Sequence, residues 1–145
     1  FFGGVDYGGQ RPLEVSCDAG DAKQVLIEEL AVKKAVKYFR NLGYAVRNVG
    51  NKKSYDLECR KGNINIHVEV KGTTTGGESI ILTPNEVANA KGHRSALFVL
   101  HSIKKRGRSG VKGGMRFVLN PWRIKAHGEL IPSLYRYVVS ETCPR

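Results

Sequence analysis

The stretch "SYDLECRKGNINIHVEVKG", residues 54–72, predicts two β-strands joined by a tight turn. We expect strands at residues 55–60 and 64–71, with 61–63 ("KGN") as the turn, because glycine and asparagine suit short hairpin connections. Successive side chains of a strand point to opposite faces. The second strand therefore has an apolar face and a polar one, which carry Ile64, Ile66, Val68 and Val70, and Asn65, His67, Glu69 and Lys71, respectively.

The charges at the open end of this hairpin need an explanation, because unpaired charges are costly on a half-buried sheet. Asp56 shares the polar face and lies away from the turn, as Glu69 and Lys71 do. Alternation by itself favours a cross-strand ion pair on a solvated face. The same side chains also suit phosphodiester chemistry, since carboxylates bind Mg²⁺ and a nearby lysine stabilises negative charge.

The excess of basic residues indicates a negatively charged partner. The chain has 145 residues, enough for one domain, and 24 Lys and Arg against 13 Asp and Glu give a formal net charge of +11. Such a balance favours nucleic acid as the partner, with a membrane surface or another acidic partner as the alternative. No apolar run is long enough to span a membrane. The three cysteines are widely spaced, which favours a reducing, cytoplasmic setting over a disulfide framework or a zinc site.

Helical and strand patterns alternate along the rest of the chain. Residues 21–42 predict a helix with Asp21 as the N-cap, and "TPNE" at 83–86 has the capping-box spacing that begins a second helix ending near Ala90. The apolar stripe expected on the first helix consists of Val25, Val32, Val36 and Phe39. Further strands are expected at 44–50, 79–82, 95–103, 115–119 and 133–140, with a basic loop at 104–114 and a short helix within 120–128.

This order predicts an α/β fold, a mixed sheet flanked by helices. Residues 1–20 are glycine-rich and aperiodic, so we expect a flexible arm or linker there and a single domain over residues 21–145. Among the remaining candidates, His67 is interpreted as a solvated strand histidine, and Trp122 as a buried anchor for the last helix.

The spacing of Asp56 and Glu69-Val70-Lys71 resembles the D…(E)-x-K signature of the PD-(D/E)XK nuclease superfamily. A wider resemblance covers roughly residues 23–139. The segments "ELAVKKAV", "SYDLEC", "HVEVKGTTTG", "ILTPNEVANA" and "LNPWRI" are similar, in order, to the NO VEIN C-terminal-like, nuclease-related domain. The resemblance implies a restriction-endonuclease-like core in α-β-β-β-α-β order. It also implies a Mg²⁺- or Mn²⁺-dependent DNA endonuclease within a larger restriction, defence or helicase-linked system.

Carried onto this sequence, the resemblance assigns the metal to Asp56 and Glu69 and the catalytic lysine to Lys71. It also implies an acid from the first helix. Alignment favours Glu29, whereas helical geometry places Glu28 nearer the apolar stripe, so both stay open. Gly72 is expected to end its strand and allow close backbone approach, with Thr73 as a possible phosphate contact. Glu86 is explained by the capping box and is not assigned to catalysis.

Nucleic acid, DNA rather than RNA, is the expected partner, with a helicase or another defence subunit as a second one. The candidate phosphate contacts are in the basic loop: Lys104, Lys105, Arg106, Arg108 and Lys112. A solvated loop without a role is the competing interpretation. The competing function is a catalytically inactive nuclease fold that binds nucleic acid or a partner protein.

Overall fold

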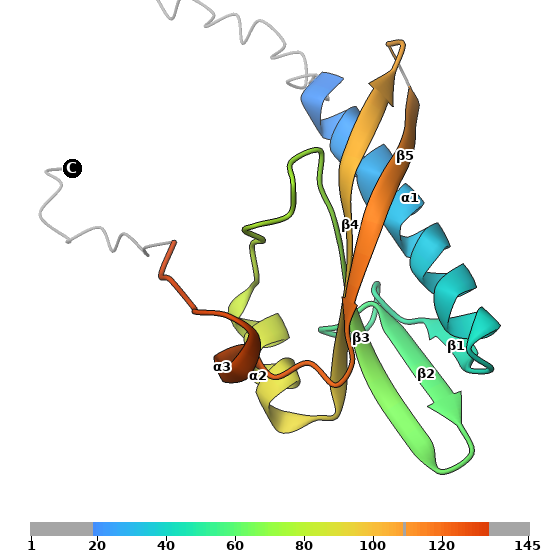
Figure 1. Ribbon diagram of the computed structural model, residues 1–145, viewed down its shortest axis with the longest axis vertical. Helices are drawn as coiled ribbons and strands as arrows, with labels where there is room; N and C mark the ends of the chain where they lie inside the picture. The colour runs from blue at the N-terminus through green and yellow to red at the C-terminus, as the bar shows by residue number, and fades with distance from the viewer. Residues whose placement is uncertain (1–18, 109, 134–145) are drawn as a thin grey trace, which may run out of the picture.

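The computed structural model describes residues 19–108 and 110–133, which form a five-stranded sheet with a long helix on one face and two short helices on the other (Figure 1). The elements are α1 (Ala19–Asn41), β1 (Ala45–Asn48), β2 (Leu57–Lys61), β3 (Ile64–Gly72), α2 (Pro84–Gly92), β4 (Ser95–Arg106), β5 (Gly110–Leu119) and α3 (Ile124–His127). This α/β order confirms the predicted fold class and is compatible with a restriction-endonuclease-like core.

The strands lie in sequence order across the sheet, β1-β2-β3-β4-β5. All neighbours are antiparallel except β3 and β4, which are parallel and are connected through α2. A crossover of this kind is what a parallel pair requires, because a tight turn cannot join parallel strands. The predicted hairpin is confirmed: Lys61 pairs with Ile64, and Gly62 in the turn has a φ of 58°, which glycine adopts readily.

The face of the sheet under α1 forms the larger core. Of the apolar set predicted from alternation, Ile66, Val68 and Val70 are buried in it, whereas Ile64, beside the hairpin turn, is 37% exposed. The helix contributes Ile27, Ala31, Ala35 and Phe39. The predicted stripe is wrong at Val25, which is 51% exposed, because the helix turns a neighbouring row of residues toward the sheet. Cys59 is a buried free thiol in this core, while Cys17 and Cys143 lie outside the described residues.

A smaller core lies on the opposite face, beneath α2 and α3. It consists of Ala90, Leu97, Val99, Trp122 and Ile124. Trp122 is 6% exposed, which confirms its predicted role as a buried anchor. This second core positions α2 over the polar face of β3, where His67 contacts Asn89 and Lys71 contacts Glu86.

Three local predictions are wrong. Residues 79–82 form no strand: Ile80 and Leu82 pack on the smaller core and Ile81 is exposed, so the alternation is present without a partner strand. The basic segment 104–114 is mostly strand, because β4 and β5 continue their pairing as far as Arg106 and Gly110. The first helix begins before Asp21, at Ala19. The arm over residues 1–18 and the strand expected at 133–140, apart from the non-strand Ser133, lie outside the described residues.

Gly72, at the end of β3, is the point where the sheet lies closest to α1. A Cβ added there would lie 2.9 Å from both Cγ2 and the carbonyl oxygen of Ile27 and 3.0 Å from Cβ of Ala31. The predicted close approach is therefore confirmed. Its cause is packing, since a side chain would push the helix from the strand.

We expect Gly72→Ala to lower the free energy of unfolding by about 1–3 kcal/mol, the usual cost of overpacking a core. Urea denaturation of the purified chain measures it. Gly92→Ala is the matched control, because nothing lies within 4 Å of a Cβ at that position, and its effect should stay within about 0.5 kcal/mol. Equal effects of the two substitutions would contradict the packing argument.

Candidate functional site

Asp56 and Glu69 are brought together by the pairing of β2 with β3. Leu57 lies opposite Val68, so the residue before Leu57 continues the ladder beside Glu69. The Asp56 backbone N–H donates to Val68 O at 3.0 Å, and Asp56 Oδ2 accepts a 2.8 Å hydrogen bond from the Val70 N–H. These two contacts hold the Asp56 carboxylate at the edge of the strand pair, on the polar face that alternation predicted.

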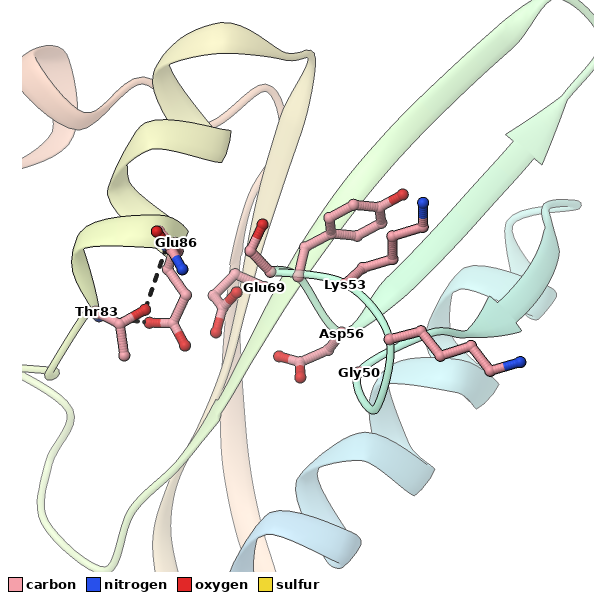
Figure 2. A pocket seen from close by; sticks show the side chains of 10 residues that line it. Gly50, Lys53, Asp56, Glu69, Thr83 and Glu86 are labelled. Carbon is pink, nitrogen blue, oxygen red and sulfur yellow. Dashed lines mark hydrogen bonds between the residues drawn. The ribbon is translucent and has the colours of Figure 1, made fainter.

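Lys71 lies between two carboxylates. Its Nζ is 3.1 Å from Glu69 Oε1 and 2.9 Å from Glu86 Oε2. Glu86 belongs to the first turn of α2, where it also completes the capping box with Thr83. The predicted capping role of Glu86 is thus confirmed, and Glu86 has a second contact, with Lys71, that the sequence did not predict. Figure 2 shows the carboxylates of Asp56, Glu69 and Glu86 directed toward one region between α2 and the loop before β2.

The electrostatics of the cluster are dominated by burial. Burial, followed by the nearby Asp56 charge, raises the pKa of Glu69 to about 8. Burial also raises the pKa of Asp56, against the opposing hydrogen bond from Val70. For Lys71 burial disfavours the charged form, but attraction from Glu69 and hydrogen bonds to Glu86 and Glu69 outweigh it and raise its pKa. Burial therefore favours the protonated form of Glu69, and the two neighbouring glutamates favour the charged form of Lys71.

Glu58, on the same polar face of the hairpin, is an acidic residue whose contacts are those of a structural ion pair. Arg47 and Arg60 donate hydrogen bonds to its carboxylate, and these lower its pKa to about 2. Glu58 and Glu69 therefore shift in opposite directions, although both lie on the polar face of the hairpin. Burial and a like charge perturb Glu69, which makes it a candidate functional group, whereas two arginines stabilise the charged form of Glu58.

The carboxylates open into a hollow of about 490 Å³, the carboxylate hollow, lined by Gly50, Lys52, Lys53, Ser54, Tyr55, Asp56, Glu69, Thr83, Asn85 and Glu86. Two exposed lysines stand on its rim, Lys52 and Lys53. Sequence reasoning missed them and the second role of Glu86. The dipeptide "KK" before the hairpin was the available signal for the lysines, and nothing in the sequence marked Glu86 beyond its cap.

The donor set fits a hard divalent cation. Asp56 and Glu69 supply two carboxylates facing one hollow, and Mg²⁺ commonly takes one or two carboxylates and completes its shell with waters and substrate oxygens. Over residues 19–108 and 110–133, no three His, Cys, Asp or Glu side chains are grouped to hold a metal. A site here would therefore use few protein ligands, as Mg²⁺ sites that act on phosphates do.

Other predicted site residues lie elsewhere. Glu28 and Glu29 are both exposed on α1, and neither lines the carboxylate hollow. Thr73 is half-buried after β3, with its Oγ1 2.9 Å from Thr75 Oγ1, and it also lies outside the lining. The five basic candidates are exposed on the β4–β5 hairpin, which extends away from α2 (Figure 1): Lys104, Lys105, Arg106, Arg108 and Lys112. The structure thus does not bring these cations to the hollow.

The described residues form an α/β domain with a carboxylate–lysine cluster on its central strands. The model of the family described as "Protein NO VEIN, C-terminal" matches residues 27–111, and the chain belongs to this family. No curated protein and no solved structure gave a significant match. Within the described part of the chain, no helix combines the length and apolar character needed to cross a bilayer.

Proposed function

We propose that this domain is a metal-dependent nuclease that hydrolyses phosphodiester bonds of DNA. One observation carries the proposal: Asp56 and Glu69 line one hollow, Lys71 contacts Glu69 from behind this lining, and burial raises the pKa of both carboxyls. A cross-strand ion pair on a solvated face would leave these carboxyls near their ordinary pKa. The resemblance to PD-(D/E)XK nucleases adds support, and a helicase or other defence subunit as partner belongs to the same proposal.

Each residue has a role in this proposal. Asp56 and Glu69 would hold Mg²⁺ or Mn²⁺, and such an ion polarises a phosphodiester and lowers the pKa of a bound water. Lys71 places a positive charge where negative charge develops on the phosphorus oxygens. The rim lysines, Lys52 and Lys53, attract the phosphates of the strand to the hollow. Glu86 positions Lys71 through the 2.9 Å contact.

The alternative function is a nuclease fold that binds nucleic acid without cutting it. The observation that favours it is the engagement of Lys71, whose Nζ already contacts both Glu69 and Glu86. A lysine held in this way stabilises the fold and is less available to a substrate. Cleavage assays separate the two functions directly.

Cleavage of plasmid and single-stranded DNA, with Mg²⁺ or Mn²⁺, tests the proposal. We expect the wild-type chain to cut, and Asp56→Asn to lower the rate at least about 100-fold, because the metal loses one of its two carboxylates. Glu129→Gln, an exposed acid outside the hollow, should cut like the wild type. Wild-type cleavage no faster than that of Asp56→Asn would overturn the nuclease proposal.

A further inference from the structure

Three stacked rings lie next to the carboxylate hollow. Tyr55 and His67 are parallel within 5°, with ring centroids 3.8 Å apart, and His67 and His93 follow at 4.5 Å and 29°. His67 Nδ1 also lies 2.8 Å from Asn89 Oδ1 of α2. The interpretation of His67 as a solvated strand histidine is therefore wrong, because it is half-buried between two rings. His93, at the end of the stack, is exposed.

A second hollow, the basic hollow, lies at the far end of this stack. It has a volume of about 760 Å³ and is lined by Ala90, Lys91, His93, Arg94, Ser95, Pro121, Trp122, Arg123, Ile124 and Lys125. No acidic residue is among these residues. Its four cations, on the segments around α2 and α3, are exposed and form no ion pair with any described residue. Such uncompensated charge favours a polyanion.

The stack joins the two hollows. Tyr55 lines the carboxylate hollow, and His93 lines the basic hollow. His67, on β3, lies between them and is two residues from Glu69. The three rings therefore span the distance between the basic hollow and the carboxylate hollow.

We propose that the basic hollow and the Tyr55–His67–His93 stack bind one strand of nucleic acid and lead it to the carboxylate hollow. Arg94, Arg123 and Lys125 hold its phosphates, and an unpaired base stacks on exposed His93. This inference rests on the proposed function for the class of substrate. It adds that the substrate is single-stranded at the site, and it moves the main contact away from the β4–β5 hairpin.

A single strand follows from the combination of surfaces. Cationic grooves with flat side chains are the usual means of binding unpaired strands, because every base offers a face for stacking. In a duplex the bases are already stacked and paired, so His93 would gain nothing from them. A duplex would be held by phosphate contacts alone.

Fluorescence anisotropy with a labelled 20-nucleotide DNA strand, in EDTA so that nothing is cut, tests the proposal. The first variant is Arg94→Ala/Arg123→Ala/Lys125→Ala. Its matched control, Lys104→Ala/Lys105→Ala/Arg106→Ala, removes the same charge from the hairpin. We expect the first to weaken binding at least about 10-fold and to reduce the salt dependence by about two ions, since single strands release about 0.7 ion per phosphate contact. The control should weaken it less than about 3-fold.

His93 tests the stacking step. His93→Ala should weaken single-strand binding about 5- to 10-fold, the low end of the cost of losing one base–ring stack, and His93→Phe should restore it. Binding of the matching duplex should not change. Equal losses for the two triple variants, or equal losses of strand and duplex with His93→Ala, would overturn the proposal. Because binding is measured without metal, a chain that binds as expected but never cuts would overturn only the nuclease proposal.

Discussion

Replacement of Lys71 by methionine should lower the rate of Mg²⁺-dependent DNA cleavage by about 10²- to 10³-fold, the usual cost of losing one group that stabilises transition-state charge. Methionine keeps an unbranched side chain of similar shape in this mostly buried position and removes the ammonium group, which lies 3.1 Å from Glu69 Oε1. The measurement is the single-turnover rate at saturating enzyme. DNA affinity in EDTA should change less than the rate, since Lys52 and Lys53 remain on the rim.

Two further variants serve as comparisons for Lys71→Met. Lys33→Met removes an exposed lysine from α1 and should cut like the wild type. Glu86→Gln retains a side chain able to complete the capping box, and it leaves Lys71 paired with Glu69, so a loss of only about 10-fold is expected. A Lys71→Met variant that cuts as fast as Lys33→Met would show that the lysine serves the fold alone.

Glu69 should make the metal-free protein less stable as the pH rises. Its pKa is about 8 in the folded chain, against an ordinary value of 4.5 for a glutamate in water. Between these values the folded state keeps a proton that the unfolded state has released, so the free energy of unfolding falls from pH 4.5 to 8. Over this interval the loss is about 4 kcal/mol, because each pKa unit of the shift corresponds to about 1.4 kcal/mol. Glu69→Gln has no proton to lose and should exceed the wild type in stability at pH 8, with a shallow residual slope from Asp56.

Urea denaturation in EDTA at pH 5, 6, 7 and 8 measures this effect. Glu58→Gln is the control of opposite sign, because the pKa of Glu58 is lowered to about 2 and its stabilisation is complete above pH 4.5. That variant should be less stable than the wild type by a similar amount at every pH of the series. Parallel pH profiles for the wild type and Glu69→Gln would contradict the raised pKa.

Much of the sheet was predictable because its information is local. The alternation in β3 separated core from polar residues, and "KGN" marked the turn. The capping box of α2 was equally explicit. The errors occurred where a local pattern needs a partner that is distant in the chain. Ile80 and Leu82 have the alternation of a strand, but they pack on the smaller core and have no partner strand. Residues 104–106 have the composition of a loop, but they pair with β5 and extend β4.

The residues of the candidate site also fall into those that local sequence indicates and those that only the packing reveals. Asp56, Glu69 and Lys71 were identified from the sequence because one hairpin carries all three. Glu86, Lys52 and His93 were not, because they reach the site only through the packing of α2 and of the loop before β2. The predicted first-helix acid was placed by alignment, and the packing of α1 leaves both Glu28 and Glu29 exposed.

The sequence by itself determined the charged hairpin, its faces and the basic balance of the chain, since each depends on residue type and a spacing of a few residues. Only the tertiary structure decided which charges meet. Burial beneath α2 raises the pKa of Glu69, while two arginines lower that of Glu58, although both acids share one face of the same hairpin. The difference arises because the cost of a buried charge depends on its neighbours in space, and most of these come from other elements of the fold.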